Sequence, residues 1–170
     1  MSPQQPDHMH LETDPANSAY RLMLQAPTDG LLRPLSQHPS PVIRLLAGAG
    51  FCLQVSSQQL LSPCSGETSL HFLPHPCIRL RHHTGIQLRL DLPIDWLARM
   101  GQGLRWFHSK RPVAAGQPLL EIDPGFLTSK PLLSVVVFPH QAIQPEPVQY
   151  GKTVLALEPC MFVQLTGKKP

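Results

Sequence analysis

The strongest constraint in this sequence is a strict alternation of polar and apolar residues between positions 77 and 91. Ile78 and Leu80 alternate with Arg79 and Arg81, and after the loop His82–Gly85 apolar residues return at positions 86, 88 and 90. A period of two is typical of half-buried strands, and the glycine that closes the loop can supply a positive φ. The segment therefore predicts an antiparallel β-hairpin.

The register of this hairpin decides which polar side chains share its outer face. Pairing Leu80 with Ile86 keeps apolar residues opposite each other and places His75 opposite Asp91. We therefore expect an imidazole and a carboxylate side by side, and we interpret this pair as the candidate functional site. The alternative is an ordinary cross-strand polar pair worth about 0.2–1 kcal/mol.

Turn residues and repeated patterns predict the rest of the fold. The 170 residues suit one domain, and 20 prolines with 11 glycines favour short strands joined by many turns. The turn at 27–30 recurs 36 positions later at 63–66, and the pattern at 113–122 recurs 35 positions later at 148–157. Such repeats indicate a duplicated supersecondary unit, so we expect an all-β protein whose copies are halves of one closed antiparallel sandwich.

The ends and the helical content follow from local composition. Residues 1–18 are polar and proline-bearing, which predicts a disordered leader, and 167–170 form a polar tail, leaving 19–166 as the domain. The segment 95–103 is the one expected helix, a short turn capped by Asp95. The apolar run 132–138 has the length of a buried strand.

Charge and hydrophobicity exclude some functions. The net charge is only +3, and no nucleic-acid motif accompanies the arginines at 79, 81, 89, 99, 105 and 111, so we expect a solvated basic face and no nucleic-acid partner. No apolar run approaches the ~20 residues of a membrane span, and the four cysteines lack CxxC spacing. A cytoplasmic protein without membrane insertion is the expectation.

Nine short motifs, in order, resemble the glucose-type EIIA domain of the bacterial phosphoenolpyruvate-dependent sugar phosphotransferase system. The likeness covers residues 22–165. The motifs are APTDG (26–30), GAGFCLQV (48–55), LSPCSG (61–66), His75, GIQLRLDLPID (85–95), GQG (101–103), VAAGQPLLEID (113–123), LLSVVVF (132–138) and YGKTVLAL (150–157). The resemblance implies a flattened antiparallel β-sandwich or barrel with internal duplication, similar to the duplicated hybrid motif, with one or two short helical turns.

The resemblance also implies a site with two facing histidines. In the family, one histidine accepts a phosphoryl group from the histidine phosphocarrier protein and passes it to a sugar-permease domain, while the other steadies the phosphate. His75 matches the steadying histidine, and Asp91, six residues after Gly85, matches the acceptor. The resemblance places the partner-docking face on Val42, Ile43, Leu46, His71, Leu73 and Arg89.

A carboxylate at the acceptor position changes the expected chemistry. It is a poorer nucleophile than a neutral imidazole and repels a dianionic phosphoryl group. Leu73 replaces a relay threonine of the family, and Arg44, Arg79 and Arg89 are predicted near a face that in the family meets a basic carrier. We therefore expect a diverged EIIA-like component, inactive at the standard acceptor site, that acts as a protein-binding or regulatory module.

Two alternatives stay open at this point. One is a working phosphocarrier in sugar uptake that uses His75 as its acceptor. The other is a zinc-dependent association module in which His75 and Asp91 bind the metal together with a partner; no other metal or cofactor is expected. The partner is a regulatory protein, with docking to the carrier or the permease domain weakened or lost.

Overall fold

The computed structural model describes residues 19–45, 50–72, 75–99, 101–107, 112–138, 143–147 and 149–166. The predicted leader at 1–18 and tail at 167–170 lie outside these ranges. None of the helices within them has the length and hydrophobicity that a membrane crossing requires.

The strands form an antiparallel all-β fold, as predicted. In the described residues the largest sheet has eight strands in the order β13-β2-β3-β11-β7-β6-β5-β9. These are β13 (Thr153–Val154), β2 (Gly30–Pro34), β3 (Gly50–Val55), β11 (Leu132–Phe138), β7 (Gln87–Asp91), β6 (Cys77–Arg81), β5 (Gly66–His71) and β9 (Pro112–Val113). Two smaller sheets are β1-β14-β12, from β1 (Ala19–Gln25), β14 (Pro159–Thr166) and β12 (Ile143–Pro147), and β4-β10-β8, from β4 (Gln59–Leu61), β10 (Pro118–Ile122) and β8 (Leu104–Trp106).

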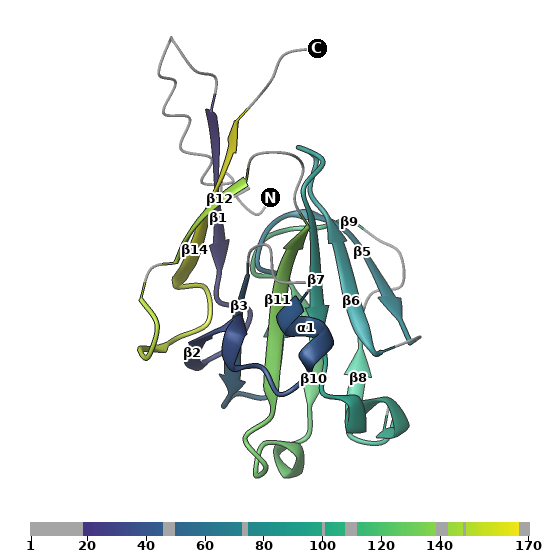
Figure 1. The fold of residues 1–170 in the computed structure, drawn as a ribbon. Helices are drawn as coiled ribbons and strands as arrows, with labels where there is room; N and C mark the ends of the chain where they lie inside the picture. Colours follow the sequence, from purple (N-terminus) through teal and green to yellow (C-terminus); the bar gives the residue numbers. More distant parts are fainter. Residues whose placement is uncertain are drawn as a thin grey trace.

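The main core lies behind the large sheet, and a second, smaller core lies in front of it. Alternate residues of the hairpin, including Ile78, Leu80, Leu88 and Leu90, are buried in the main cluster. On the opposite face, called the outer face here, the short helix α1 (Pro41–Leu45) lies in front of β7 and β11 (Figure 1). Leu35, Ile43, Cys52 and Val136 pack together beneath it.

The predicted hairpin is present, but the predicted register is wrong by two residues. Strands β6 and β7 pair Leu80 with Leu88 and Cys77 with Asp91, so Cys77 and not His75 lies opposite Asp91. Gly85 adopts the expected positive φ of 90°.

The difference comes from His82, which extends the buried row instead of occupying the loop. Its backbone N–H donates to the carbonyl of Ile86 (2.9 Å), and its side chain is only 3% exposed. The ring Nδ1 lies 2.8 Å from the hydroxyl of Thr84, which supplies a polar partner in the buried position. The turn therefore contains three residues ending in glycine, a common hairpin loop, and the strands pair two residues further along.

Backbone contacts agree with the predicted duplication. Gln25 N–H donates to the Pro63 carbonyl (3.0 Å), and Leu61 N–H donates to the Pro27 carbonyl. The equivalent residues of the two turns thus exchange hydrogen bonds reciprocally. In the second repeat, Gly116 and Gly151 both adopt a positive φ, 78° and 81°, where glycine is favoured.

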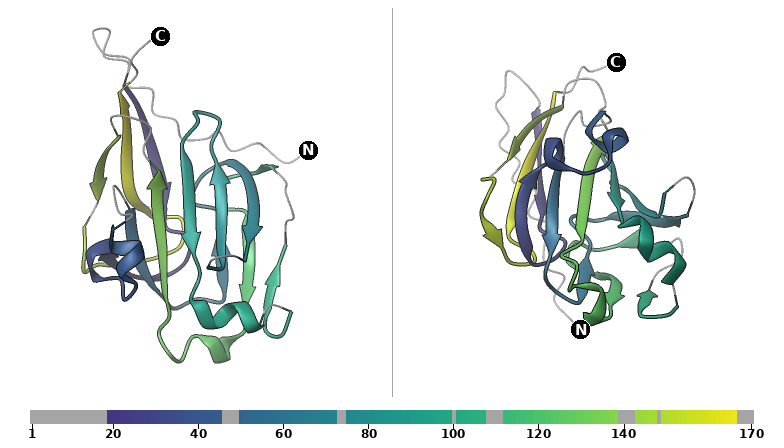
Figure 2. Two further views of the ribbon diagram at one scale, coloured as in Figure 1. Left: turned by 45° about the vertical axis from the view of Figure 1, so that its right-hand side comes forward. Right: turned by 60° about the horizontal axis from the view of Figure 1, so that its bottom comes forward.

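The helical segments differ from the expectation. The predicted helix at 95–103 is a 3-10 helix, η2 (Ile94–Arg99), and two more such turns are η1 (Leu35–Gln37) and η3 (Pro124–Phe126). The α-helix is α1, which the sequence pattern did not predict because five residues are too short to show a helical period. Figure 2 shows η2 and η3 at one end of the molecule, away from α1.

Engineered disulfides test the hairpin register. Arg81→Cys/Gln87→Cys should crosslink on mild oxidation, because directly paired residues have Cα atoms about 4.5–5.5 Å apart, within the range of a disulfide. Arg81 and Gln87, and also Arg79 of the control below, are exposed, and the four native cysteines are buried. Mass spectrometry of digested protein reads out the bond.

The matched control is Arg79→Cys/Gln87→Cys, which are partners in the register expected from the sequence. In the observed register they are diagonal and too far apart to bond readily. Faster oxidation of the control pair than of the test pair would contradict the structure.

Candidate functional site

Asp91 belongs to a row of side chains that runs across the outer face. Neighbours in the row are directly opposed in adjacent strands and therefore point to the same side of the sheet. From one edge to the other the row is Arg33, Cys52, Ser134, Asp91, Cys77 and His71. The sheet thus brings together residues that are scattered through the sequence.

Asp91 is a buried carboxylate held by an arginine of its own strand. It is 3% exposed, and Nε of Arg89 lies 3.0 Å from both of its oxygens. Ser134 Oγ donates a longer hydrogen bond of 3.4 Å to Oδ2. Burial raises the pKa of Asp91, while the Arg89 charge and the hydrogen bonds oppose that shift. Both oxygens are therefore engaged.

Arg89 is fixed from two sides. Besides its ion pair with Asp91, its guanidinium lies 5.5 Å from the centre of the Phe138 ring, within the range of a cation–π contact. Its side chain is 19% exposed. Arg89 therefore presents a positioned cation at the surface.

His38, which the sequence did not single out, interacts electrostatically with Asp91. It follows η1, is 7% exposed, and its Nδ1 accepts the backbone N–H of Ser40 at 3.0 Å. Burial lowers the pKa of His38, and the Asp91 charge opposes the shift. Arg44 donates to the carbonyl of His38 (2.6 Å) and holds this segment against α1.

His75 lies beyond the end of the β6–β7 ladder. Leu92 N–H donates to the Pro76 carbonyl at 2.9 Å, and His75 precedes that last pair in a bend, where it is half-buried. No hydrogen bond or ion pair joins His75 to Asp91, although both are described residues. The predicted side-by-side pair is therefore corrected to the pair Cys77–Asp91.

The six residues expected on the docking face have different positions. Val42 is 51% exposed, whereas Ile43 is 6% exposed and packs into the small core, so it is not available to a partner. Ile43 is the residue of α1 that faces the sheet. His71 is half-buried, with Nε2 2.8 Å from Ser69 Oγ. Leu46 and Leu73 lie outside the described residues.

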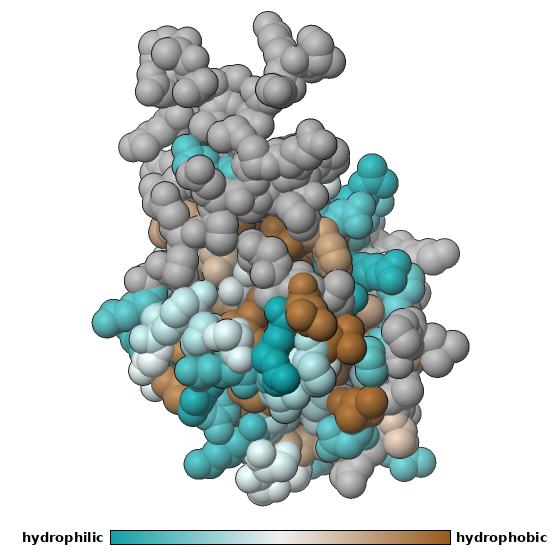
Figure 3. Space-filling view, viewed as in Figure 1, coloured by the Kyte–Doolittle hydropathy of each residue, from teal (hydrophilic) through white to brown (hydrophobic). Residues whose placement is uncertain are grey.

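Leu45 belongs to the exposed surface that the sequence reasoning missed. It is 87% exposed on α1, next to Val42. Figure 3 shows apolar and strongly hydrophilic groups side by side over this part of the outer face. The mixture of apolar and charged groups suits contact with another protein.

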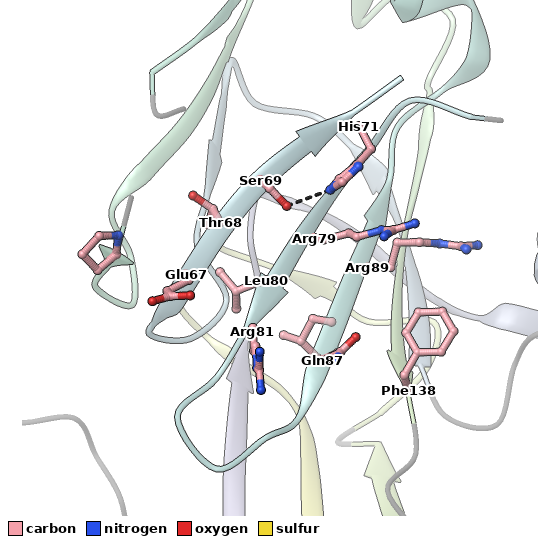
Figure 4. Close-up of a pocket in the computed structure, with 12 residues that line it drawn as sticks. Glu67, Thr68, Ser69, His71, Arg79, Leu80, Arg81, Gln87, Arg89 and Phe138 are labelled. Carbon is pink, nitrogen blue, oxygen red and sulfur yellow. Dashed lines mark hydrogen bonds between the residues drawn. The ribbon is translucent and has the colours of Figure 1, made fainter. Parts of the chain in front are cut away.

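A hollow of about 720 Å³ lies on the outer face of β5, β6 and β7, beside Asp91. Three arginines, Arg79, Arg81 and Arg89, line it together with His71 and other residues of these strands (Figure 4). Among the described residues, no group of three or more His, Cys, Asp or Glu side chains is placed to hold a metal ion.

Comparisons with known proteins agree on one family. A family model described as phosphoenolpyruvate-dependent sugar phosphotransferase system, EIIA 1, matches residues 22–142. The glucose-specific EIIBCA component of the PTS system of Corynebacterium glutamicum is 28% identical over 130 residues, 74% of this chain and 19% of that protein. The mannose-specific EIIBCA component of C. glutamicum ATCC 13032 is 27% identical over 121 residues, 69% of this chain and 18% of that protein. The chain spans about a fifth of the length of these relatives.

Among solved structures, the glucose permease IIA from Mycoplasma capricolum superposes with a TM-score of 0.71 at 21% sequence identity. The match covers 84% of this chain and 95% of that one. At this identity the likeness supports the β-sandwich fold.

Removing the cation of the buried pair should destabilise the protein in a pH-dependent way. Arg89→Met leaves Asp91 buried and unpaired, so at pH 7 the free energy of unfolding should fall by about 3 kcal/mol, the low end for such pairs because Arg89 is partly exposed. Without the arginine, the folded-state pKa of Asp91 lies further above the unfolded value. The deficit relative to wild type should therefore shrink as the pH falls through that folded pKa. Urea unfolding at several pH values measures it.

The matched control is Arg105→Met, which breaks an ion pair with Glu121 whose side chains are 69% and 48% exposed. This change should cost no more than about 1 kcal/mol. An Arg89→Met deficit that equals the control, or that does not change with pH, would contradict the described pair.

Proposed function

The chain belongs to the EIIA 1 family of the phosphoenolpyruvate-dependent sugar phosphotransferase system, and we propose that it is a diverged EIIA component, impaired in histidine phosphotransfer and acting as a protein-binding or regulatory module. In this proposal Asp91 occupies the position of the acceptor histidine. The observation that carries the proposal is the engagement of both Asp91 oxygens by Arg89 in a buried position.

The chemistry of phosphoryl transfer supports this proposal. The usual acceptor is a neutral imidazole nitrogen with a free lone pair and a path to the incoming phosphorus. The Asp91 carboxylate is a weaker nucleophile in its ion pair with Arg89, is buried at 3% exposure, and carries the same sign of charge as the phosphoryl group. Phosphorylated aspartates also depend on a metal ion held by further oxygen ligands, typically carboxylates. In the described residues the row that contains Asp91 has no second acid.

His38 is a poor substitute acceptor in spite of its nearness to Asp91. It is 7% exposed, its Nδ1 already accepts a hydrogen bond, and Arg44 holds its backbone. An incoming carrier would have to displace this segment before the ring was accessible.

The surface supports an altered choice of partner. Val42 and Leu45 on α1 retain exposed apolar area, while Arg79 and Arg89 add positive charge to the same outer face. Like charges across an interface weaken docking and select against partners. We therefore propose that binding to a basic phosphocarrier or to a sugar-permease domain is weakened or lost, that a regulatory protein partner is retained, and that the protein acts in the cytoplasm.

One alternative is that His75 accepts phosphate directly. In its favour, His75 is half-buried instead of fully buried. It also has no hydrogen bond to another described residue that would occupy its ring. Under this alternative the protein is a working carrier in sugar uptake with a relocated acceptor.

Phosphotransfer from phosphoenolpyruvate, with the two general carrier proteins present, separates these proposals. We expect no phosphoryl gain in wild type by intact mass at neutral pH, because Asp91 is engaged and repels the donor. The same assay is run on His75→Ala, Asp91→Ala and Asp91→His. A gain in Asp91→His alone would show that the carrier still docks and that only the chemistry is lost.

A stable gain in wild type that disappears only in His75→Ala would overturn the impaired-transfer proposal in favour of the relocated acceptor. A gain in wild type that disappears in Asp91→Ala would also contradict the impaired-transfer proposal, because it would show that the Asp91 carboxylate accepts the phosphoryl group.

Zinc-dependent association through His75 and Asp91 stays a prediction. For a metal to bind, the ion pair between Asp91 and Arg89 must first break so that the carboxylate can coordinate the ion. Self-association or partner binding that requires zinc should therefore be stronger in Arg89→Met than in wild type, and should be reversed by EDTA in light scattering or a pull-down. Equal behaviour of the two proteins with and without zinc would argue against it.

A further inference from the structure

Two guanidinium groups lie side by side on the outer face without an acid between them. Arg79 on β6 pairs directly with Arg89 on β7, and Figure 4 shows both side chains extending in the same direction from their strands. Like charges in directly opposed positions destabilise a sheet. The arrangement is therefore one that the fold by itself does not favour.

The described carboxylates do not neutralise this cluster. Asp91 contacts Arg89 only through Nε, which leaves the two terminal nitrogens as donors. Glu67 lies opposite Arg81 in the strand register, but among the described residues no ion pair forms with Arg79 or Arg81. The hollow therefore keeps an excess of positive charge.

The hollow is also lined by the Glu67 carboxylate, which lies opposite Arg81, and by neutral hydrogen-bonding groups. Ser69 lies opposite Arg79 in the register, so a hydroxyl and two guanidinium groups follow one another across β5, β6 and β7. Gln87 and the ring of Phe138 close the side next to Arg89. A volume of about 720 Å³ is in the range of small-molecule sites.

We propose that this hollow binds a phosphate monoester of a small metabolite, with Arg79 and Arg89 holding the phosphate and Ser69 and Gln87 beside it. Guanidinium pairs suit phosphate because their planar donors match its oxygens, and they keep their charge at any physiological pH. Arg89 is already fixed by Asp91 and Phe138, so little side-chain entropy is lost on binding. The site goes beyond the proposed function and does not depend on whether any residue accepts a phosphoryl group.

Calorimetric titration of the full chain tests the site with three probes: glucose 6-phosphate, inorganic phosphate and glucose. Wild type should bind the two phosphate-bearing probes saturably and glucose not at all, and higher salt should weaken binding. Arg79→Gln should weaken glucose 6-phosphate binding by about tenfold or more, because a charge-assisted contact is lost. The side chain of Arg79 is exposed, so the fold should tolerate the change.

The matched control is Arg105→Gln, which removes the same charge from the exposed pair with Glu121. Unchanged binding in this variant, together with the loss in Arg79→Gln, would support the site. The proposal is overturned if neither phosphate probe binds, if glucose binds as well as its phosphate, or if the two variants weaken binding equally. Binding of a polyanion such as RNA or an acidic peptide, without binding of either phosphate probe, would also overturn it. Phosphotransfer is measured separately, so failure of one proposal leaves the other standing.

Discussion

The central strand β11 is the element on which the site depends. It is hydrogen-bonded along both edges, to β3 on one side and to β7 on the other. Its inward residues are fully buried, and on the outer face Ser134 lies between Cys52 and Asp91. Strand pairing fixes the neighbours of Asp91 in the row, and neither of the two directly opposite residues, Ser134 and Cys77, carries a positive charge. Arg89, on the same strand and the same face, supplies the cation.

Much of the fold could be predicted because alternation and turn residues are local signals. The hairpin, Gly85 and the strand at 132–138 follow from period two, glycine conformation and apolar length. The register could not be predicted in the same way. A shift of two residues leaves every side chain on its original face, so the alternation is equally consistent with either pairing. The outcome was decided by His82, whose burial against Thr84 no polarity pattern indicates.

The motif order led to the family, and the assignment of Asp91 to its acceptor position stays a prediction. The residues that lie near Asp91 in space could not be predicted in the same way. His38 and Ile43 reach the outer face through η1 and α1, elements of three and five residues that are too short to show a period. Their contacts join segments far apart in the chain, and such contacts depend on how the sheet closes. The sequence therefore indicates which strand carries the acid, while the tertiary structure determines which histidine lies near it.

Two arginines of the outer face, Arg79 and Arg89, differ in whether an acidic partner in the fold explains their charge. Arg89 has a structural reason, since a carboxylate that is 3% exposed requires a cation. Arg79 has no carboxylate partner among the described residues: the residue opposite it is a second arginine, Asp91 is already paired with Arg89, and the side-chain contact of Arg79 is with the Cys77 thiol. A neutral residue at this exposed position would avoid the repulsion between the two guanidinium groups. The charge at Arg79 is understandable if an anion occupies the hollow, since a phosphate between the two guanidinium groups turns their repulsion into shared attraction.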